Sequence, residues 1–216
     1  MAGGICLTSS REGGVPVCHR IEPLRLSDLY EALKALRTSG RARVPRQDPG
    51  EVVPDAYPGK KIALFVPTPQ GSLEPTELTW GFDGSTNASS KLVFNTRIDT
   101  ALSQARWGRG LWAEPIQSGR CLIPVRSFYE SWTRMPPQRG AQVRFSYPGH
   151  QVFLLAGVWQ NDRCSIVTTE PNASVAPMHS RMPLVLAPGE SSIWLGPEFA
   201  SLADRSRIVL DATQDA

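Results

Sequence analysis

The heptapeptide Pro177-Met178-His179-Ser180-Arg181-Met182-Pro183 organises this sequence of 216 residues. It follows a run rich in β-branched residues at 164–169 and precedes a short apolar run at 184–186, and both runs are typical of β-strands. The bracketing prolines restrict the backbone between the two runs. We therefore expect His179 and Arg181 to lie on a rigid connection between strands, where functional side chains are often displayed. The plain alternative is a surface loop that holds one hydrogen-bonded histidine.

Short strands separated by turns dominate the rest of the chain. Their apolar and β-branched content predicts strands at residues 3–7, 62–66, 76–80, 91–94, 121–124, 142–147 and 151–159. The last two are expected to form a hairpin around Pro148-Gly149, and a turn near Gln70-Gly71 joins the second and third. The strands are too closely spaced for βαβ units. The sequence thus predicts a single strand-dominated α+β domain over residues 1–216, with a mixed sheet or barrel-like core and a few peripheral helices.

Three helices are predicted around that core. The clearest spans residues 26–40, with Ser27 as its cap and a leucine stripe along one face. Shorter helices are expected at 100–106 and 191–195. Prolines recur through residues 41–61 and predict a long ordered loop there, and the last dozen residues are expected to be peripheral.

Composition and charge narrow the classes of partner. The chain is 41% hydrophobic and 20% charged with a net charge of +3, as in a mildly basic soluble globular protein. Of the 23 basic residues all but Lys34, Lys60, Lys61 and Lys91 are arginines, which suits phosphate binding and base stacking. GC-rich coding produces the same bias, so the arginines alone do not choose between the two explanations.

The cysteines and the absence of long apolar runs point to a reduced cytoplasmic protein. Cys6, Cys18, Cys121 and Cys164 form neither a C-x-x-C pair nor a zinc pattern, and the last three are interpreted as structural. No apolar run reaches membrane-spanning length and no signal peptide is visible. We expect no metal, no cofactor and no membrane partner, and a monomer that associates with the nucleoid when bound to DNA.

Several polar side chains each follow a predicted strand, so the strand ends can bring them to one edge of the sheet. Chemically they comprise a nucleophile, an acid/base pair and an anion clamp. These residues are Cys6, Asn95, Arg97, Glu130, His179 and Arg181. Glu130 is unusual because it lies among three aromatic residues, and burial raises the pKa of a carboxyl that has no partner. The alternative is that the six are separate structural residues.

The tryptophans allow two interpretations. Trp107 and Trp112 alternate with Arg106 and Arg109, an arrangement that can stack unpaired bases beside phosphate contacts. Core or hairpin packing is the simpler role for both. Trp80, Trp132, Trp159 and Trp194 are assigned to the core.

Four ordered motifs resemble the SRAP family, the SOS-response-associated peptidases or abasic-site processing proteins. They are Trp80-Gly81, then Asn95-Thr96-Arg97 through Thr100, then Arg120-Cys121-Leu122-Ile123-Pro124 with Phe128-Tyr129-Glu130-Ser131-Trp132, and Thr168-Thr169 with His179-Ser180-Arg181-Met182-Pro183. The family patterns are Asn-Ala-Arg-x-Glu-Thr, Arg-Cys-Leu-x-Pro with Phe-Tyr-Glu-Trp, and Thr-Thr with His-x-Arg-Met-Pro. The resemblance runs from about residue 80 to 195.

The resemblance implies a protein that binds single-stranded DNA and traps abasic sites. In the family, the amine and thiol of an N-terminal cysteine capture the sugar aldehyde as a Schiff base and then a thiazolidine. Glu130 would promote the proton transfers, His179 would act as acid/base at the sugar and in strand-cleaving lyase chemistry, and Asn95 would orient the nucleophile. Phosphates would be held by Arg97 and Arg181, with Trp107 and Arg106 beside them. Peptidase activity would mean little more than exposure of the terminal cysteine.

The amino terminus departs from the family pattern, which begins Met-Cys-Gly-Arg. The nearest cysteine to the start is Cys6, whose nitrogen is an amide rather than a free amine. Clipping after Ile5, translation from the codon of Ile5, or loss of covalent capture would each explain this. The family's Tyr-Asn-x-Ala-Pro-Gly element is also altered, with Asp55 at the position of the Asn.

Two other functions remain open at this point. A cysteine hydrolase would use Cys6, His179 and Glu130 as nucleophile, base and orienting group, although no oxyanion-hole motif is visible. A non-catalytic DNA-interaction module with a degenerate site is the third hypothesis.

Overall fold

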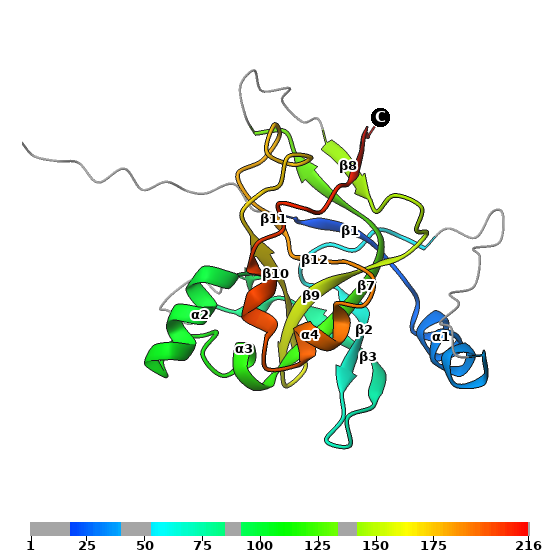
Figure 1. Cartoon of the computed structure of the whole chain (residues 1–216), viewed down its shortest axis with the longest axis vertical. Coiled ribbons are helices and arrows are strands. Elements are labelled where there is room, and N and C mark those ends of the chain that lie inside the picture. Colours follow the sequence, from blue (N-terminus) through cyan, green and yellow to red (C-terminus); the bar gives the residue numbers. More distant parts are fainter. Residues whose placement is uncertain (1–17, 40–52, 85–91, 134–141, 216) are drawn as a thin grey trace, which may run out of the picture.

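Five strands close into a barrel in the computed structural model, which describes residues 18–39, 53–84, 92–133 and 142–215. The strands are β2 (Lys61–Pro67), β3 (Leu73–Trp80), β7 (Arg120–Ser131), β9 (Phe153–Gln160) and β10 (Arg163–Thr169). They pair in the order β9-β10-β3-β2-β7, and pairing of β7 with β9 closes the ring (Figure 1). The prediction of a strand-dominated α+β fold with a barrel-like core is confirmed.

The barrel is mixed in strand direction. Most neighbours are antiparallel, but β10 runs parallel to β3 and to the short strand β6 (Asn95–Arg97). Runs of consecutive buried residues in β2, β7 and β10 explain their strong apolar signal, because both faces of these strands are covered. Trp80 and Trp194 are fully buried, as expected, whereas Trp132 and Trp159 are partly buried against the same core.

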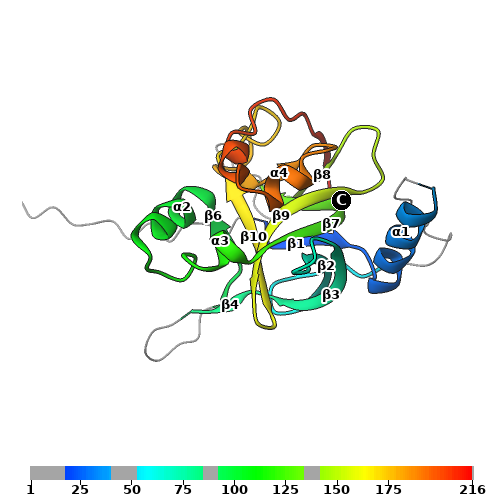
Figure 2. The same cartoon turned by 60° about the horizontal axis from the view of Figure 1, so that its bottom comes forward.

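Short strands and helices surround the barrel. The strands are β1 (Arg20–Pro23), β4 (Phe82–Asp83), β5 (Leu92–Val93), β8 (Gln142–Ser146), β11 (Met182–Pro183), β12 (Val185–Leu186) and β13 (Asp211–Gln214). The helices are α1 (Leu26–Ser39), α2 (Ile98–Trp107), α3 (Pro115–Ser118), α4 (Ser191–Leu195) and the 3-10 turn η1 (Phe199–Ala203). In both views α1 lies on one side of the barrel and α2 on the opposite side (Figures 1 and 2). None of the described helices is long and apolar enough to cross a membrane.

Strand β7 is far longer than the predicted 121–124 and serves two regions of the sheet. Its first half, up to Val125, pairs with β9 and β2 and closes the barrel. Its second half, from Ser127, pairs with β1 and β8. The predicted hairpin of 142–147 with 151–159 is therefore wrong: both segments are strands, but they pair with successive halves of β7 instead of with each other.

The structure confirms some of the other local predictions and contradicts others. Helix α1 agrees with the prediction, but Ser27 is not its cap, because the helix begins at Leu26 and the Asp28 carboxylate accepts the Arg25 N–H instead. The turn at Gly71 is confirmed by a positive φ of 79°. The last residues are not wholly peripheral, since Ile208 and Leu210 are buried before β13 adds an exposed edge strand. The predicted strand at 3–7 and most of the loop at 41–61 lie outside the described residues.

Candidate functional site

The structure brings Glu130 and His179 together in the interior. Glu130 Oε2 lies 4.0 Å from His179 Nδ1, and the two side chains are 0% and 1% exposed. They lie 49 positions apart in the numbering, on the end of β7 and on the connection between β10 and β11. A buried carboxyl beside an imidazole is an arrangement suited to general acid–base chemistry.

Strand geometry explains why Glu130 faces inward. Side chains alternate along a strand, so Glu130 shares a face with Phe128, which stacks on Phe145 at 5.1 Å in the core. Burial raises the pKa of Glu130 well above its ordinary value, and the hydrogen bond from the Cys18 backbone N–H opposes this only in part. A raised pKa favours the protonated carboxyl, which is the form that can donate a proton.

The loop that carries His179 is held by a side chain that sequence reasoning missed. Asn172 accepts the N–H groups of Ser174 and Val175 and donates to the carbonyl of Ile208 at 2.7 Å. This turn ends where the His179 N–H donates to the carbonyl of Val175 at 3.0 Å. An Asn at the start of a turn satisfies local N–H groups, and the pair Pro171-Asn172 carried that signal in the sequence.

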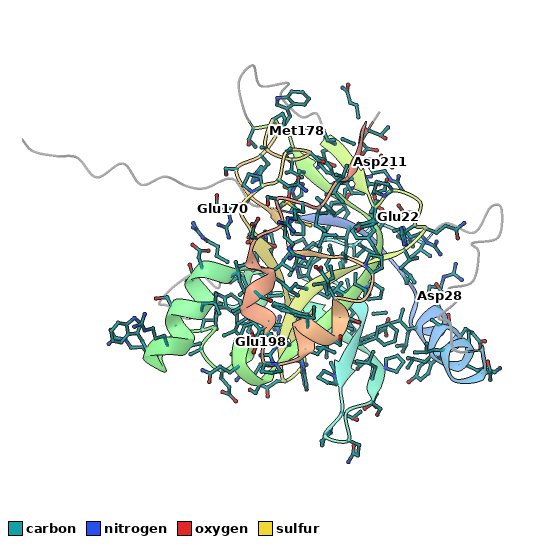
Figure 3. The ribbon with its side chains drawn as sticks, viewed as in Figure 1. Glu22, Asp28, Glu170, Met178, Glu198 and Asp211 are labelled. Carbon is teal, nitrogen blue, oxygen red and sulfur yellow. The ribbon has the colours of Figure 1, made fainter. Side chains whose placement is uncertain are left out.

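A second contact ties this loop to β7. Thr133 donates from both its backbone N–H (3.0 Å) and its hydroxyl (3.2 Å) to the carbonyl of Met178. Within the loop, His179 Nδ1 lies 3.2 Å from the N of Arg181 and 3.1 Å from its carbonyl oxygen. Met178 lies near the top of Figure 3, above Glu170 and far from Glu198. The prediction of a held connection between two strands is thereby confirmed.

Asn95 and Arg97 lie on β6, directly alongside β10. Asn95 pairs with Ile166 and Arg97 with Thr168, which also pairs with Pro183 of β11. The carboxyl end of β10 thus gathers the strands that carry Asn95, Arg97 and the His179 loop. Thr96, between the two predicted site residues, is fully buried and donates to Ser165 Oγ at 2.9 Å.

Arg97 and Arg181 meet at one carboxylate. Asp99 accepts from Arg97 Nη2 at 2.8 Å and from Arg181 Nη2 at 3.2 Å. Partial burial alone would raise the pKa of Asp99, but the Arg97 hydrogen bond and the Arg181 charge outweigh it and lower that pKa. Arg181 also binds Glu170 and the carbonyl of Thr168. Its side chain is 9% exposed against 57% for Arg97, so Arg97 is the more available cation.

The cysteine beside Glu130 is Cys18. Its backbone N–H donates to Glu130 Oε1 at 3.1 Å and to Oε2 at 3.0 Å. Cys18 is fully buried, and burial, followed by the Glu130 charge, raises the pKa of its thiol. The predicted nucleophile Cys6 lies outside the described residues. A signal for Cys18 was present in the sequence, because Cys18-His19-Arg20 keeps the Cys-x-Arg spacing of the family start while Cys6-Leu7-Thr8 does not.

The negative charge that Asp55 brings in place of the family's Asn is neutralised. Asp55 accepts from Arg20 Nε at 2.6 Å, and Asp215 near the carboxyl terminus also pairs with Arg20. The Arg20 guanidinium lies 3.8 Å from the centroid of the Tyr129 ring. Together these contacts hold β1 and its neighbour Cys18 against β7.

The two candidate stacking tryptophans differ. Trp112 is buried and packs edge-on against Phe82 at 5.0 Å, as core packing requires. Trp107 is 69% exposed at the end of α2, so packing is the wrong interpretation for it. Arg106 is also exposed there, and Gly108 ends the helix in the left-handed conformation. The end of α2 therefore presents an aromatic and a basic side chain to solvent.

The similarity to known proteins completes this description. The family model for SOS response associated peptidase (SRAP) matches residues 24–215. This chain belongs to the SRAP family. Within the described ranges, no three His, Cys, Asp or Glu side chains gather closely enough to hold a metal ion.

Curated relatives carry the description abasic site processing protein. The chain is 31% identical over 137 residues to YoaM of Bacillus subtilis (strain 168), covering 58% of each chain. It is 30% identical over 134 residues to YoqW, found in Bacillus subtilis (strain 168) and in Bacillus phage SPbeta. The matched part spans less than two thirds of these relatives' length.

Solved structures share the fold at low identity. A phage-related protein from Bordetella bronchiseptica matches with a TM-score of 0.63 and 18% identity, covering 92% of this chain and 94% of that one. A protein from Bacteroides thetaiotaomicron matches with a TM-score of 0.60, 18% identity and 91% coverage of both chains. Both likenesses concern the fold alone.

Proposed function

We propose that this protein binds single-stranded DNA at abasic sites and captures the exposed sugar aldehyde with a cysteine at the Glu130–His179 pair. The observation that carries the proposal is the buried pair itself, 4.0 Å apart and in direct contact with the backbone of Cys18. The SRAP family and the relatives described as abasic site processing proteins support the choice of substrate.

The chemistry needs a proton donor that is sheltered from water. Attack of an amine on the aldehyde carbon gives a carbinolamine, and loss of its hydroxyl as water requires a proton from a nearby acid. Glu130 suits this role because it can take the proton that the attacking nitrogen loses and deliver it to the hydroxyl, and burial favours its protonated form. Addition of the thiol to the resulting imine closes the ring, while His179 moves a proton at the sugar and Asn95 orients the nucleophile.

Flanking nucleotides would contact the exposed side chains near β6 and α2. Arg97 projects a half-exposed guanidinium at the start of α2, and Arg106 and Trp107 are exposed at its other end. Ten residues of α-helix span about 15 Å, so the helix can follow several nucleotides of an extended strand. Arg181 supports this surface by holding Asp99 and Glu170.

The decisive experiment incubates the protein with a single-stranded oligonucleotide that carries one abasic site. A band that survives denaturation, together with salt-sensitive binding, supports the proposal. Trp107→Ala should weaken noncovalent binding by about tenfold, since stacking contributes about 1–3 kcal/mol per base. Absence of both the band and salt-sensitive binding, with every form of the chain, would refute it.

A cysteine hydrolase is less well supported by the described residues. Such an enzyme needs a thiolate, and burial followed by the Glu130 charge raises the pKa of the Cys18 thiol. The Cys6 version of that hypothesis stays a prediction, because Cys6 lies outside the described residues.

A further inference from the structure

The nitrogen of Cys18 occupies an unusual position. In the unprocessed chain it is a peptide N–H, yet it is shared between both oxygens of a carboxylate that has no exposure to water. Backbone amides commonly pair with carbonyls of neighbouring strands, and β1 does so from Arg20 onward. The chain therefore directs the nitrogen of one specific residue at an acidic group in the interior.

Glu130 lacks a cationic partner of comparable strength. Across the described ranges no lysine or arginine forms an ion pair with it, and His179 at 4.0 Å is its nearest basic group. A buried carboxylate is costly unless a charge compensates it. An α-ammonium on Cys18 would supply that charge at the position where the amide nitrogen now lies, 3.0 Å from Oε2.

The backbone of Cys18 is strained as well. Its φ is 38°, and the other described non-glycine residue with a positive φ is Asn161, a residue type that tolerates this region. For a cysteine that conformation costs about 1–3 kcal/mol. Because φ exists only while a residue precedes Cys18, freeing its nitrogen removes the strain.

We infer that Cys18 is the first residue of the working form of this protein, and that the peptide bond between Val17 and Cys18 keeps the site latent. The inference rests on the proposed function, because a free α-amine beside the thiol is what aldehyde capture needs. It moves the nucleophile from Cys6 to Cys18. It also makes exposure of the Cys18 amine the step that activates the site.

Two routes lead to that form. Hydrolysis of the Val17–Cys18 peptide bond consumes one water, whose hydroxyl joins the Val17 carbonyl carbon and whose proton joins the nitrogen. The products are a carboxylate on Val17 and an ammonium on Cys18. Alternatively, a valine codon such as GUG can start translation, and removal of the initiator methionine then leaves Cys18 first.

The test compares one sample before and after a defined cut. The full chain is purified with residues 12–17 replaced by the recognition sequence of a site-specific protease that accepts cysteine after the cut. Cleavage yields the Cys18-first chain, and thermal unfolding before and after cutting verifies that the fold is retained. Both samples are then incubated with a single-stranded oligonucleotide that carries one abasic site, and the heat-stable adduct is quantified on a denaturing gel.

The expected result is at least a 100-fold increase in adduct on cutting. In the cut Cys18→Ser chain a borohydride-trapped Schiff base should still form while the heat-stable adduct is lost, since the amine remains and the thiol does not. A matched chain cut before Cys6 should stay inactive. Intact mass of the unmodified protein from its own host should correspond to a chain that begins at Cys18.

Several outcomes would overturn the inference while leaving the proposed function standing. Equal capture by the uncut chain, or capture by the chain that begins at Cys6, would show that Cys18 need not be terminal. Salt-sensitive binding to the abasic strand without any adduct in either sample would show a recognition site without capture. A full-length mass of active protein from the host would exclude both routes. Loss of all binding in every form would instead count against the proposed function itself.

Discussion

Two glutamates lie at the second half of β7, one on the neighbouring strand β1 and one on β7 itself, and their surroundings differ. Glu22 on β1 lies opposite Ser127, accepts its hydroxyl at 2.8 Å and pairs with Arg144 at 2.9 Å. Within the part of the chain that the structure describes, Glu130 on β7 contacts neither a guanidinium nor a hydroxyl, and it faces the core with His179 and the Cys18 nitrogen. Glu22 is neutralised as a structural carboxylate usually is, whereas Glu130 is left in need of a partner.

The difference shows that the two faces of β7 have different roles, one in ion pairs that stabilise the fold and the other in the candidate site. Because side chains alternate along β7, its outer face carries Ser127 and Tyr129, which join the Glu22 and Arg20 clusters. Its inner face carries Phe128 and Glu130. A carboxyl buried on the core face costs stability unless it is neutralised, and such a cost is characteristic of functional sites.

The largest expected effect comes from Glu130→Gln in the Cys18-first chain. Adduct formation should slow by at least about 100-fold, because a positioned acid contributes roughly 10²–10⁴ in rate. In the uncut chain, where no ammonium pairs with Glu130, the free energy of unfolding should not fall, since the amide removes a buried ionisable group. Single-turnover adduct kinetics and urea denaturation measure the two quantities, with Glu22→Gln as the matched control. Equal slowing in both variants would erase the distinction between the two carboxylates.

The second effect concerns the pH dependence of stability in the uncut chain. The pKa of Glu130 is raised on folding, so between its ordinary and its raised value the folded state holds more protons than the unfolded state. Stability should therefore fall as pH rises through this window, by up to about 1.4 kcal/mol per pH unit.

Urea denaturation from pH 5 to 8 measures this slope, and Glu130→Gln should flatten it. Cutting before Cys18 should also reduce it, because the new ammonium favours the ionised carboxyl. Asp99 cannot mimic the effect, since its lowered pKa removes stability only as pH falls into the acid range. An unchanged slope in Glu130→Gln would mean that burial of this carboxyl does not control the titration.

A smaller effect is expected from Glu22→Gln. Loss of the partly exposed ion pair with Arg144 should lower the free energy of unfolding by about 1 kcal/mol. Adduct formation should stay within twofold to threefold of the parent chain, roughly the scatter of a distant substitution. Thermal unfolding measures the change in stability, and the adduct assay measures capture. Strong loss of capture with intact stability would make Glu22 part of the site.

The smallest effect is expected from Asp55→Asn, which restores the residue type of the family motif. Arg20 neutralises Asp55, so removing that charge should alter stability by less than about 1 kcal/mol. Capture should change correspondingly little. A large gain in the adduct assay would indicate that the charge of Asp55 reaches the lesion site after all.

Much of the fold was accessible from the sequence where local patterns decide the structure. The helical period of α1 and the apolar runs of β2 and β10 predict these elements correctly, because burial of one element follows its own periodicity. The leucine stripe of α1 is only partly buried, since Leu29 lies in the core whereas Leu36 is exposed. Motifs select Glu130 and His179 from the sequence, and the structure places the two side chains 4.0 Å apart. The DNA contacts expected of Arg97, Arg106 and Trp107 stay predictions.

The remainder depends on contacts between distant segments. Strand β1 has four residues, two of them charged, so Arg20–Pro23 shows no strand pattern until it pairs with β7. For the same reason the sequence alone predicts a structural role for Cys18. The second half of β7 mixes polar and aromatic residues, so the sequence does not show that it continues the strand of Cys121–Pro124. Without that long strand, 142–147 and 151–159 are predicted to pair with each other instead of with β7. Nonlocal pairing overrides local preference in such segments.

The continuity of β7 also governs which motions the site can undergo. Glu130 lies on the same continuous strand whose first half seals the barrel, and its own segment is paired with β8, so we expect it to open only together with the barrel. Its amide should exchange with deuterium only through global unfolding, whereas amides near Trp107 should exchange through local fraying of the helix end. The acid is thereby held still for as long as the protein is folded, and adaptation to different DNA strands is left to the periphery.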